Sequence, residues 1–489
     1  MNKPENNLTP EKKQLGLLDA TLIVSGSMIG SGIFLVSADM SRGLGSAGWL
    51  LFAWILAGII TLLGALSYGE LAGMMPKAGG QYVYIQRAFG KLTAFVYGWT
   101  VFTVIQTGVI AAVAVAFAKY TGQIFPWWNE NHVLLTIGGF SVSWAQVLAI
   151  VLIAFLTAVN TLGIEEGKWL QRLFTISKIL AILGLVGAAF FIGGKTNYLA
   201  QNFSHPFDAA GSPEKISQWT SLGSLALLAA FGTAMVGSLF SSDAWNNVTF
   251  IAGEIRQPEK NIPRSLFLGT LIVTLLYLLA NMAYLSVLPL QGDISGTLEQ
   301  QGISHAPFGR VGTSAAQMIF GEPGVVLMAI LIMVSTFGCN NGMILAGARL
   351  FSTMAKEGLF FKGAAKTNKN GVPAYALWAQ AAWAGVLCLS GSYNDLLNYC
   401  TFASLLFYIV TVAGLFRLRS KEPDMIRPYK VMAYPWVPAC YIALASSVAI
   451  CLMVFKTGNS LAGLGIVALG APIYMLFQYF KKPELNTGS

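Results

Sequence analysis

The sequence predicts an all-α polytopic membrane protein with twelve transmembrane helices. Of its 489 residues, 55% are hydrophobic and 10% are charged, whereas soluble domains contain about 25% charged residues. The mean hydropathy is +0.63. Twelve spans of about 20 residues would use about 240 positions, which this chain can supply. The composition excludes an ordinary soluble enzyme, a disordered chain and a large soluble domain on a single anchor.

Twelve apolar windows alternate with polar or turn-rich segments along the chain. The fourth window is short, and only a tight turn separates the ninth from the tenth. The windows cover residues 16–40, 46–73, 92–118, 144–161, 172–193, 221–250, 265–289, 323–351, 374–391, 394–416, 433–455 and 460–480.

The basic residues predict how these spans are oriented. If the N-terminus is cytoplasmic, 23 of the 30 Lys and Arg residues fall on inner segments, six fall on outer segments, and Lys178 lies inside a span. Inner loops of membrane proteins carry such an excess. We therefore expect a multi-pass protein with a cytoplasmic N-terminal tail (1–15) and a cytoplasmic C-terminal tail (481–489). Because no organellar transit peptide is evident, the expected compartment is the cell inner (plasma) membrane. The net charge of +9 is then a topology signal, so the lipid bilayer is an expected partner and nucleic acid is not.

Small and polar residues interrupt two of the predicted spans. One run, 26–34, lies in the first span, and the other, 237–245, lies in the sixth. Paired interruptions in inverted halves point to a transporter's binding site. Unwinding frees backbone N–H groups for a carboxylate and carbonyls for an ammonium. The alternative is that glycines such as Gly26 and Gly30 only allow close helix packing.

The five-span separation of the two interruptions divides the chain into two halves. Because five is an odd number, the second half is inserted upside down relative to the first. We expect the first half at 16–193, an extracellular loop at 194–220, the inverted second half at 221–418, and two further helices at 419–480.

Three ionisable residues lie where the membrane should disfavour them. Such groups cost at least ~2.5–3.5 kcal/mol each on insertion scales and are functional candidates. Lys178 lies about a turn or more into the fifth span, where it either snorkels to the cytoplasmic surface or binds freed carbonyls of the first span. Asp243 lies within the sixth-span interruption, so we expect a role in binding or gating. Glu70 ends the second span, where we expect a structural or gating ion pair.

Seven short runs spread over nearly the whole chain carry a family resemblance. They are residues 26–34, 68–71, 75–84, 243–246, 254–263, 277–284 and 337–342. In this order and at these topological positions they resemble the amino acid–polyamine–organocation (APC) superfamily, most closely a bacterial member of the L-type amino acid transporter (LAT) family. The resemblance implies a LeuT-like five-plus-five inverted repeat with broken helices 1 and 6 and two additional C-terminal helices.

The resemblance also implies where a substrate binds. The substrate carboxylate would meet backbone amides around Ser31 and Gly32, and its amino group would meet carbonyls near Met28 and Ile29 and around Phe240. Phe240 matches the aromatic residue that closes over the substrate. The expected substrate-binding residues are Met28, Ile29, Gly30, Ser31, Gly32, Phe240, Ser241, Asp243, Asn246 and Cys339.

Gating and coupling positions follow from the same resemblance. Lys178 matches the fifth-helix lysine that stands in the second sodium site, and Tyr277 matches a seventh-helix tyrosine linked to the first-helix break. Together with Phe240 and Glu70 these are the expected gating or coupling residues. No catalytic residue, metal or cofactor is expected.

Two departures from the family pattern have consequences. Family members that pair with a glycoprotein heavy chain carry a cysteine between helices 3 and 4, but residues 119–145 contain none. No disulfide-linked heavy chain is therefore expected. The common glycine before the sixth-helix tryptophan is Ala244 here, which would narrow the pocket slightly.

These features predict sodium-independent transport of L-amino acids across the plasma membrane by alternating access. An exchanger (antiporter) that favours neutral amino acids is the first interpretation. A proton-coupled symporter, in which Lys178 loses a proton during the cycle, and an exchanger that accepts cationic amino acids through Asp243 are the alternatives. A membrane sensor that does not transport belongs to a different class. A membrane enzyme is disfavoured because the embedded polar residues lie at helix breaks and not in catalytic arrangements.

Overall fold

The computed structural model describes residues 15–137, 140–193, 196–390 and 393–480. The segment expected as the C-terminal tail and residues 1–14 of the expected N-terminal tail lie outside these ranges. The first five predicted spans correspond to α1 (Leu17–Met28) with α2 (Gly32–Leu44), α3 (Ala47–Met74), α5 (Lys91–Thr100) with η1 (Val101–Ile105) and α6 (Gln106–Ile124), α7 (Trp144–Leu162) and α8 (Ile164–Gly193).

The remaining predicted spans also coincide with helices. They are α10 (Ser224–Ser241) followed by η3 (Trp245–Thr249), α11 (Pro258–Val287), α14 (Glu322–Lys356), α15 (Ala374–Ser390), α16 (Tyr393–Lys421), α17 (Trp436–Phe455) and α18 (Thr457–Phe480).

Short elements fill the connections between the long helices. They are α4 (Gln81–Phe89), η2 (Pro126–Trp128), the antiparallel pair β1 (Val133–Ile137) and β2 (Phe140–Ser143), α9 (Tyr198–Asn202), the pair β3 (Ala210–Gly211) and β4 (Thr220–Ser221), η4 (Ala252–Glu254), α12 (Leu298–Gln301), η5 (Pro307–Gly309), α13 (Val311–Phe320) and η6 (Lys362–Ala365).

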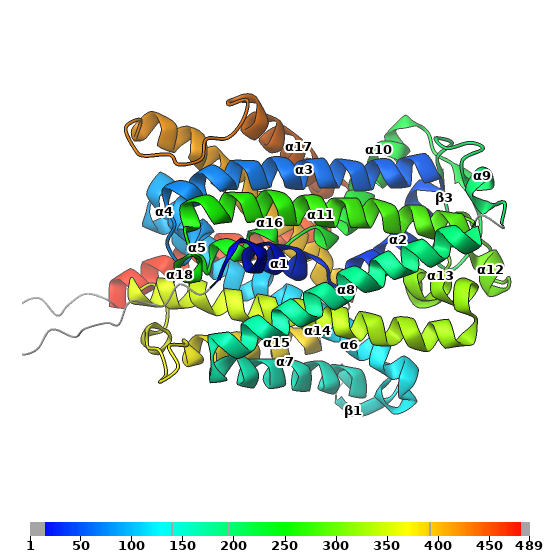
Figure 1. Cartoon of the computed structure of the whole chain (residues 1–489), viewed down its shortest axis with the longest axis horizontal. Coiled ribbons are helices and arrows are strands. Elements are labelled where there is room, and N and C mark those ends of the chain that lie inside the picture. Colours follow the sequence, from blue (N-terminus) through cyan, green and yellow to red (C-terminus); the bar gives the residue numbers. More distant parts are fainter. Residues whose placement is uncertain (1–14, 138–139, 194–195, 391–392, 481–489) are drawn as a thin grey trace, which may run out of the picture.

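The long helices run along the longest axis of the molecule, with α1 in the middle of the bundle (Figure 1). Helix α1 packs against α8, α11 and α14, and α2 packs against α10. The first interrupted segment is therefore enclosed by helices from both halves of the sequence. This position suits a site that must be shielded from lipid.

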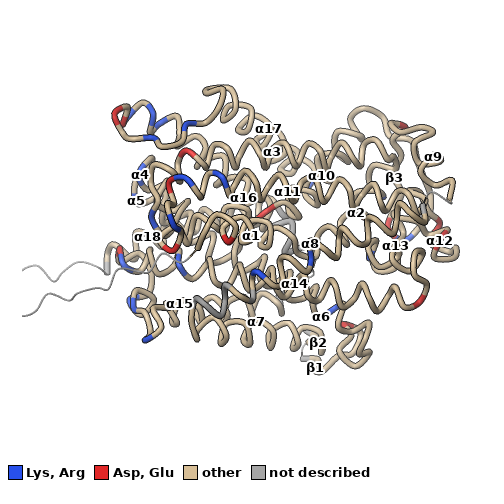
Figure 2. The backbone as a smooth tube through the Cα atoms, viewed as in Figure 1, with Lys and Arg blue, Asp and Glu red and all other residues tan. Residues whose placement is uncertain are grey.

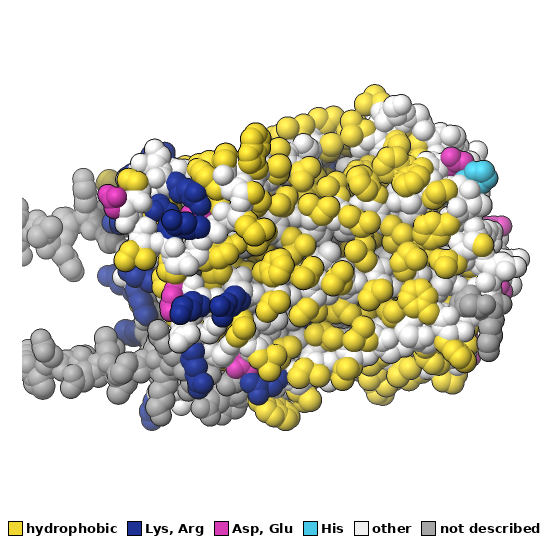
Figure 3. Space-filling model, turned by 45° about the horizontal axis from the view of Figure 1, so that its top comes forward, with side chains coloured by type: hydrophobic (Ala, Val, Ile, Leu, Met, Phe, Trp, Pro, Cys, Tyr) yellow, Lys and Arg dark blue, Asp and Glu magenta, His cyan; other side chains and the backbone are white. Residues whose placement is uncertain are grey.

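Among the described residues, ten helices are long and apolar enough to cross a membrane, or eleven if the bent pair α1 and α2 is one span. Helix α15 is apolar but shorter, so the count of twelve spans stays a prediction. In the space-filling view hydrophobic side chains cover a broad band between the two ends of the bundle (Figure 3). A polytopic membrane protein presents this kind of surface to lipid.

The two ends of the bundle differ in charge. Most Lys and Arg residues gather where α4 and α5 lie, which we call the basic end (Figure 2). The opposite end carries α9, α12, α13 and the β1–β2 pair (Figure 1). Such an imbalance between the ends is the physical basis of the predicted orientation.

Both predicted interruptions are breaks in helices. Helix α1 ends at Met28, Ile29 is extended with a ψ of 93°, and α2 starts at Gly32. The two helices are bent by 42° relative to each other. Helix α10 ends at Ser241, and Ala244 then adopts a left-handed conformation with a φ of 63°. That conformation costs a non-glycine residue about 1 kcal/mol, so the common family glycine would be less strained at this position.

Candidate substrate site at the two helix breaks

The first break is held by an internal ammonium. The Nζ atom of Lys178 on α8 lies 2.5 Å from the carbonyl oxygen of Gly26 and 2.6 Å from that of Ile29. Only 1% of the Lys178 side chain is exposed. The side chain thus points into the bundle and does not snorkel to the surface. The carbonyls that α1 leaves without helical partners are bound by a fixed positive charge.

Gly26 explains how α8 comes close enough for this contact. A Cβ atom on Gly26 would overlap the hydroxyl of Thr175, which lies one helical turn before Lys178 on α8. The missing side chain lets the two helices approach, as small residues do in membranes. Gly26 therefore serves both close packing and the expected binding function, because the close approach of α1 and α8 places the Lys178 ammonium at the break.

Side chains of α14 also donate to carbonyls of the first break, one of which Lys178 binds as well. The Ser335 hydroxyl lies 3.2 Å from the Ile29 carbonyl oxygen and 3.1 Å from that of Gly30. The Cys339 thiol donates to the Ser27 carbonyl oxygen, with sulfur and oxygen 3.0 Å apart. Gly30 faces Cys339, because a Cβ atom there would lie 3.3 Å from its sulfur.

Tyr277 on α11 joins the two breaks. Its hydroxyl oxygen lies 3.0 Å from the Met28 carbonyl oxygen and 2.9 Å from the Ser241 carbonyl oxygen. The hydroxyl has one proton, so it donates to one of these carbonyls at a time. A Cβ atom on Gly32 would overlap the Ser241 hydroxyl, so the start of α2 is packed against the end of α10.

The start of α2 has the features of an anion site. Its first N–H groups have no carbonyl one turn earlier in the same helix, and helix N-termini attract negative charge. Ser31 is the N-cap residue and is buried, as is Phe240 on the facing α10. The residues predicted to bind a carboxylate and to close over it therefore lie on two helices that pack together.

The second break holds a carboxylate bound by hydroxyl groups. The Asp243 Oδ1 atom accepts a hydrogen bond of 2.5 Å from Tyr408, and Oδ2 accepts one of 3.2 Å from Ser404. Both donors lie on α16. Asp243 is 9% exposed. In the part of the chain that the structure describes, no Lys or Arg forms an ion pair with Asp243.

A chain of amides extends from Asp243. The Tyr408 hydroxyl lies 3.2 Å from Asn246 Oδ1, and Asn246 Nδ2 donates to Gln81 Oε1 over 2.8 Å. Tyr97 also donates to Gln81 Oε1, over 2.9 Å. A cavity of about 20 Å³ lies among these side chains. Polar and apolar side chains both line it, and it has room for about one water molecule.

The sequence analysis did not single out Gln81, Tyr97, Ser404 or Tyr408 as site residues. Ser404 and Tyr408 lie four residues apart, so one face of α16 carries both hydroxyls. That spacing opposite a membrane-embedded aspartate is the signal that could have found them. Gln81 lies within one of the family-like runs, 75–84, but its partner Asn246 is 165 residues away.

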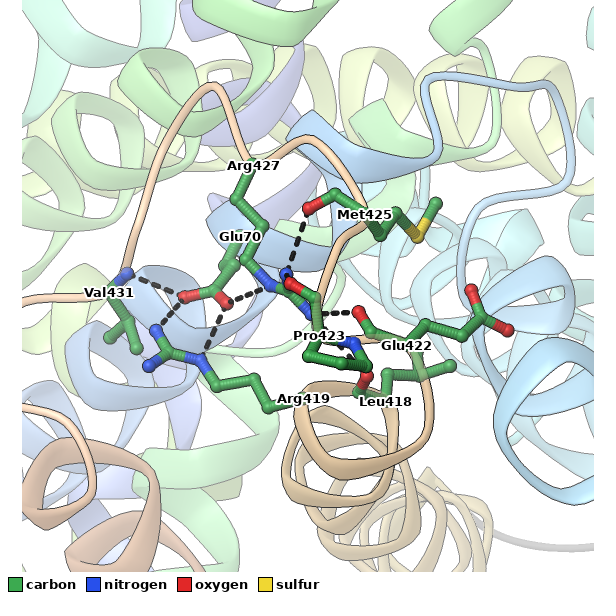
Figure 4. A network of polar contacts seen from close by, with 8 residues as sticks. All are labelled: Glu70, Leu418, Arg419, Glu422, Pro423, Met425, Arg427 and Val431. Atoms are coloured by element: carbon green, nitrogen blue, oxygen red, sulfur yellow. Dashed lines mark hydrogen bonds and ion pairs between the residues drawn. The ribbon is translucent and has the colours of Figure 1, made fainter.

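Glu70 lies in a separate polar cluster at the basic end (Figure 4). Its carboxylate accepts two hydrogen bonds from Arg419, of 2.8 and 2.6 Å, and one of 2.7 Å from the Val431 backbone. Arg427 Nε lies 3.4 Å from the same carboxylate. Glu70 is fully buried. These contacts tie α3 to the end of α16 and the segment that follows, and they include no residue of the helix breaks.

Two further ion pairs close the basic end beneath the breaks. Asp19 on α1 pairs with Arg172 on α8, and Glu254 on η4 pairs with Arg349 on α14 over 2.8 Å. Leu15 forms a backbone bridge with Ile255. The cavity beside these groups measures about 20 Å³. The start of α1 is thereby fastened to the segment that follows the second break.

A polytopic α-helical protein with two broken helices packed together belongs to the class of membrane transporters. Residues 15–477 match the model of the amino acid permease family, and the chain belongs to this family within the APC superfamily. Members of the family are transporters and not enzymes.

Known relatives match over nearly the whole chain. The serine/threonine exchanger SteT of Bacillus subtilis (strain 168) is 30% identical, and the match covers 97% of this chain and 98% of the relative. The b(0,+)-type amino acid transporter 1 of Mus musculus is 28% identical, with 98% and 90% covered. The large neutral amino acids transporter small subunit 2 of Homo sapiens is 31% identical, with 97% and 82% covered. These matches confirm the resemblance to the LAT family.

Proposed function

We propose that this protein carries L-amino acids across the plasma membrane by alternating access, without sodium and as an exchanger. The observation that carries the proposal is the contact of the Lys178 ammonium with the Gly26 and Ile29 carbonyls. A sodium ion would be bound by such oxygens, and the ammonium already supplies the positive charge. The basic end is cytoplasmic in this proposal, and residues 16–193 and 221–418 form the two inverted halves.

The substrate binds between the two breaks. Its carboxylate meets the N–H groups at the start of α2, around Ser31 and Gly32, and its ammonium meets carbonyls near Met28 and Phe240. Gly32 is packed against Ser241 in this structure. Binding therefore requires the end of α10 to move away from α2, and Tyr277, which contacts both breaks, couples that movement to the first break.

Neutral amino acids are the proposed substrates because the apolar side chains of Met28 and Phe240 lie at the two breaks, where they would contact an uncharged substrate side chain. A second candidate is a substrate with a cationic side chain. Asp243 favours it, because its carboxylate is bound by neutral hydroxyls and lies inside an apolar bundle, where a cation would compensate its charge.

The test is uptake of labelled amino acids into sodium-free liposomes that contain the purified protein. Vesicles are either empty or loaded with the same unlabelled amino acid. The proposal expects uptake only into loaded vesicles. Uptake into empty vesicles would show net transport, and an imposed proton gradient would then separate proton symport from facilitated diffusion. Binding of amino acids without uptake into either kind of vesicle would instead indicate a membrane sensor.

A further inference from the structure

A larger cavity lies at the opposite end of the bundle from the basic end. It measures about 260 Å³, compared with about 20 Å³ for the cavity beside Asp243. Its walls come from α2 between Leu35 and Arg42, the end of α6, the η5 region, and the connecting segments that carry Glu130 and Glu214. Six charged residues line it: Asp39, Arg42, Lys119, Glu130, Glu214 and Arg310.

The charges of this cavity are balanced and spatially mixed. Three side chains are cationic and three are anionic. Asp39 pairs with Arg42, and Lys119 Nζ lies 3.0 Å from Glu130. Arg310 and Glu214 line the same cavity and belong to neither of these two pairs. A guanidinium and a carboxylate that line one cavity suit a ligand that carries both a carboxylate and an ammonium.

Arg310 is the best-placed group for a carboxylate. Its guanidinium carbon lies 5.4 Å from the ring centre of Tyr120 and 4.8 Å from that of Phe308, so two rings fix its position. One of its N–H groups donates to the Lys119 carbonyl oxygen over 3.2 Å. A guanidinium has five N–H donors in a planar fork, which suits two-point binding of a carboxylate.

The cavity is connected to the substrate site through α2. Leu35 and Val36 line it, and Val36 lies one helical turn after Gly32 at the first break. A Cβ atom on Gly237 of α10 would lie 3.0 Å from Val36. Val36 therefore both lines the cavity and packs against α10, the helix whose end must move away from Gly32 in the proposed function.

We propose that this cavity is an outer binding site for the zwitterionic backbone of the transported amino acid. The carboxylate is held by Arg310, and the ammonium by Glu214 and the neighbouring carboxylates. The substrate occupies this site before α2 and α10 separate. The proposal rests on the function proposed above and on the basic end being cytoplasmic.

The test measures half-saturating concentrations for exchange separately from each side of the vesicle membrane. The probes are labelled L-serine, L-alanine and L-leucine, each with the full-length protein in loaded liposomes of known orientation. Arg310→Gln should raise the outer half-saturating concentration about tenfold, which is the expected loss of a charge-assisted hydrogen bond. The inner half-saturating concentration and the maximal rate should change less than about twofold, because the breaks are untouched.

Two further variants distinguish the loss of the outer site from misfolding of Arg310→Gln. Glu214→Gln alters an exposed side chain on a connecting segment. It should raise the outer half-saturating concentration and leave the inner one unchanged. Lys215→Gln is the matched control, because it neutralises the next residue, which does not line the cavity. The outer site would be overturned if the outer half-saturating concentration is unchanged in both Arg310→Gln and Glu214→Gln. It would also be overturned if the outer and inner half-saturating concentrations change equally. Failure of the wild type to exchange any of the probes would overturn the proposed function, and the outer site with it.

Discussion

The two helix breaks differ in the charge of the side chain that lies at each of them. At the first break, a lysine from α8 binds the freed carbonyls directly. At the second, the buried turn after α10 carries Asp243, which is bound by two hydroxyls from α16. The first break is thus compensated internally by a cation, whereas the second contains an anion with only neutral donors around it. In the proposed function, this difference corresponds to Lys178 taking the place of a sodium ion at the first break and to Asp243 facing a cationic substrate at the second.

The largest expected effect comes from removing the cation of the first break. Lys178→Met should lower the exchange rate at least about tenfold, because buried carbonyls lose charge-assisted hydrogen bonds. Exchange into loaded, sodium-free liposomes measures it. Lys366→Met, which changes an exposed lysine at the basic end, should leave the rate unchanged. If Lys178→Met exchanges like the wild type, the ammonium has no role in the cycle.

Asp243→Asn tests the second break. The amide keeps nearly the same shape but loses the charge, so exchange of neutral amino acids should persist. If the wild type accepts cationic substrates, arginine should compete about tenfold less well in this variant, because a charge-assisted interaction is lost. The measurement is the concentration of unlabelled arginine that halves the uptake of labelled leucine, taken as a ratio to the concentration of unlabelled leucine that does the same. An equal ratio in both proteins would exclude Asp243 as the cation-binding group.

Tyr277→Phe tests the link between the breaks. Removing the hydroxyl leaves carbonyls of Met28 and Ser241 without this donor, at a cost of about 1 kcal/mol, and exchange should slow about fivefold. The ring keeps its packing against Trp54. Tyr375→Phe changes an exposed tyrosine and serves as the control. A Tyr277→Phe rate equal to the control's would argue that the two breaks move independently.

Ala244→Gly should have the smallest effect. The left-handed backbone at this position is easier for glycine, so relief of strain should raise thermal stability by up to about 1 kcal/mol. Thermal unfolding of the purified protein, followed by tryptophan fluorescence, measures the change. Ala234→Gly, within regular α10, should instead lower stability, since glycine weakens a helix interior. Lower stability in both variants would contradict the strain at Ala244.

Much of the fold could be predicted from the sequence because apolar length and small-residue interruptions are local signals. The windows anticipated the long helices, and the runs 26–34 and 237–245 anticipated both breaks. Lys178 was conspicuous because a lysine inside a span is costly. The short α9, α12 and α13 were not anticipated, since segments of ten residues or fewer are too short to show a span pattern.

Partners far apart in the sequence could not be predicted from local patterns. Tyr408 and Asp243 are 165 residues apart, and Glu70 and Arg419 are 349 apart. Each pair forms only once the bundle has brought α10 to α16 and α3 to α16. The expected ion pair of Glu70 therefore had no named partner until the helices were placed in space.

The most direct test of the account is the sodium dependence of exchange in loaded liposomes. Wild-type protein is assayed in sodium chloride and in an equal concentration of choline chloride. The account predicts the same exchange rate in both salts, because the Lys178 ammonium already occupies the carbonyls of the first break. Exchange that is stimulated by sodium in the wild type would contradict it.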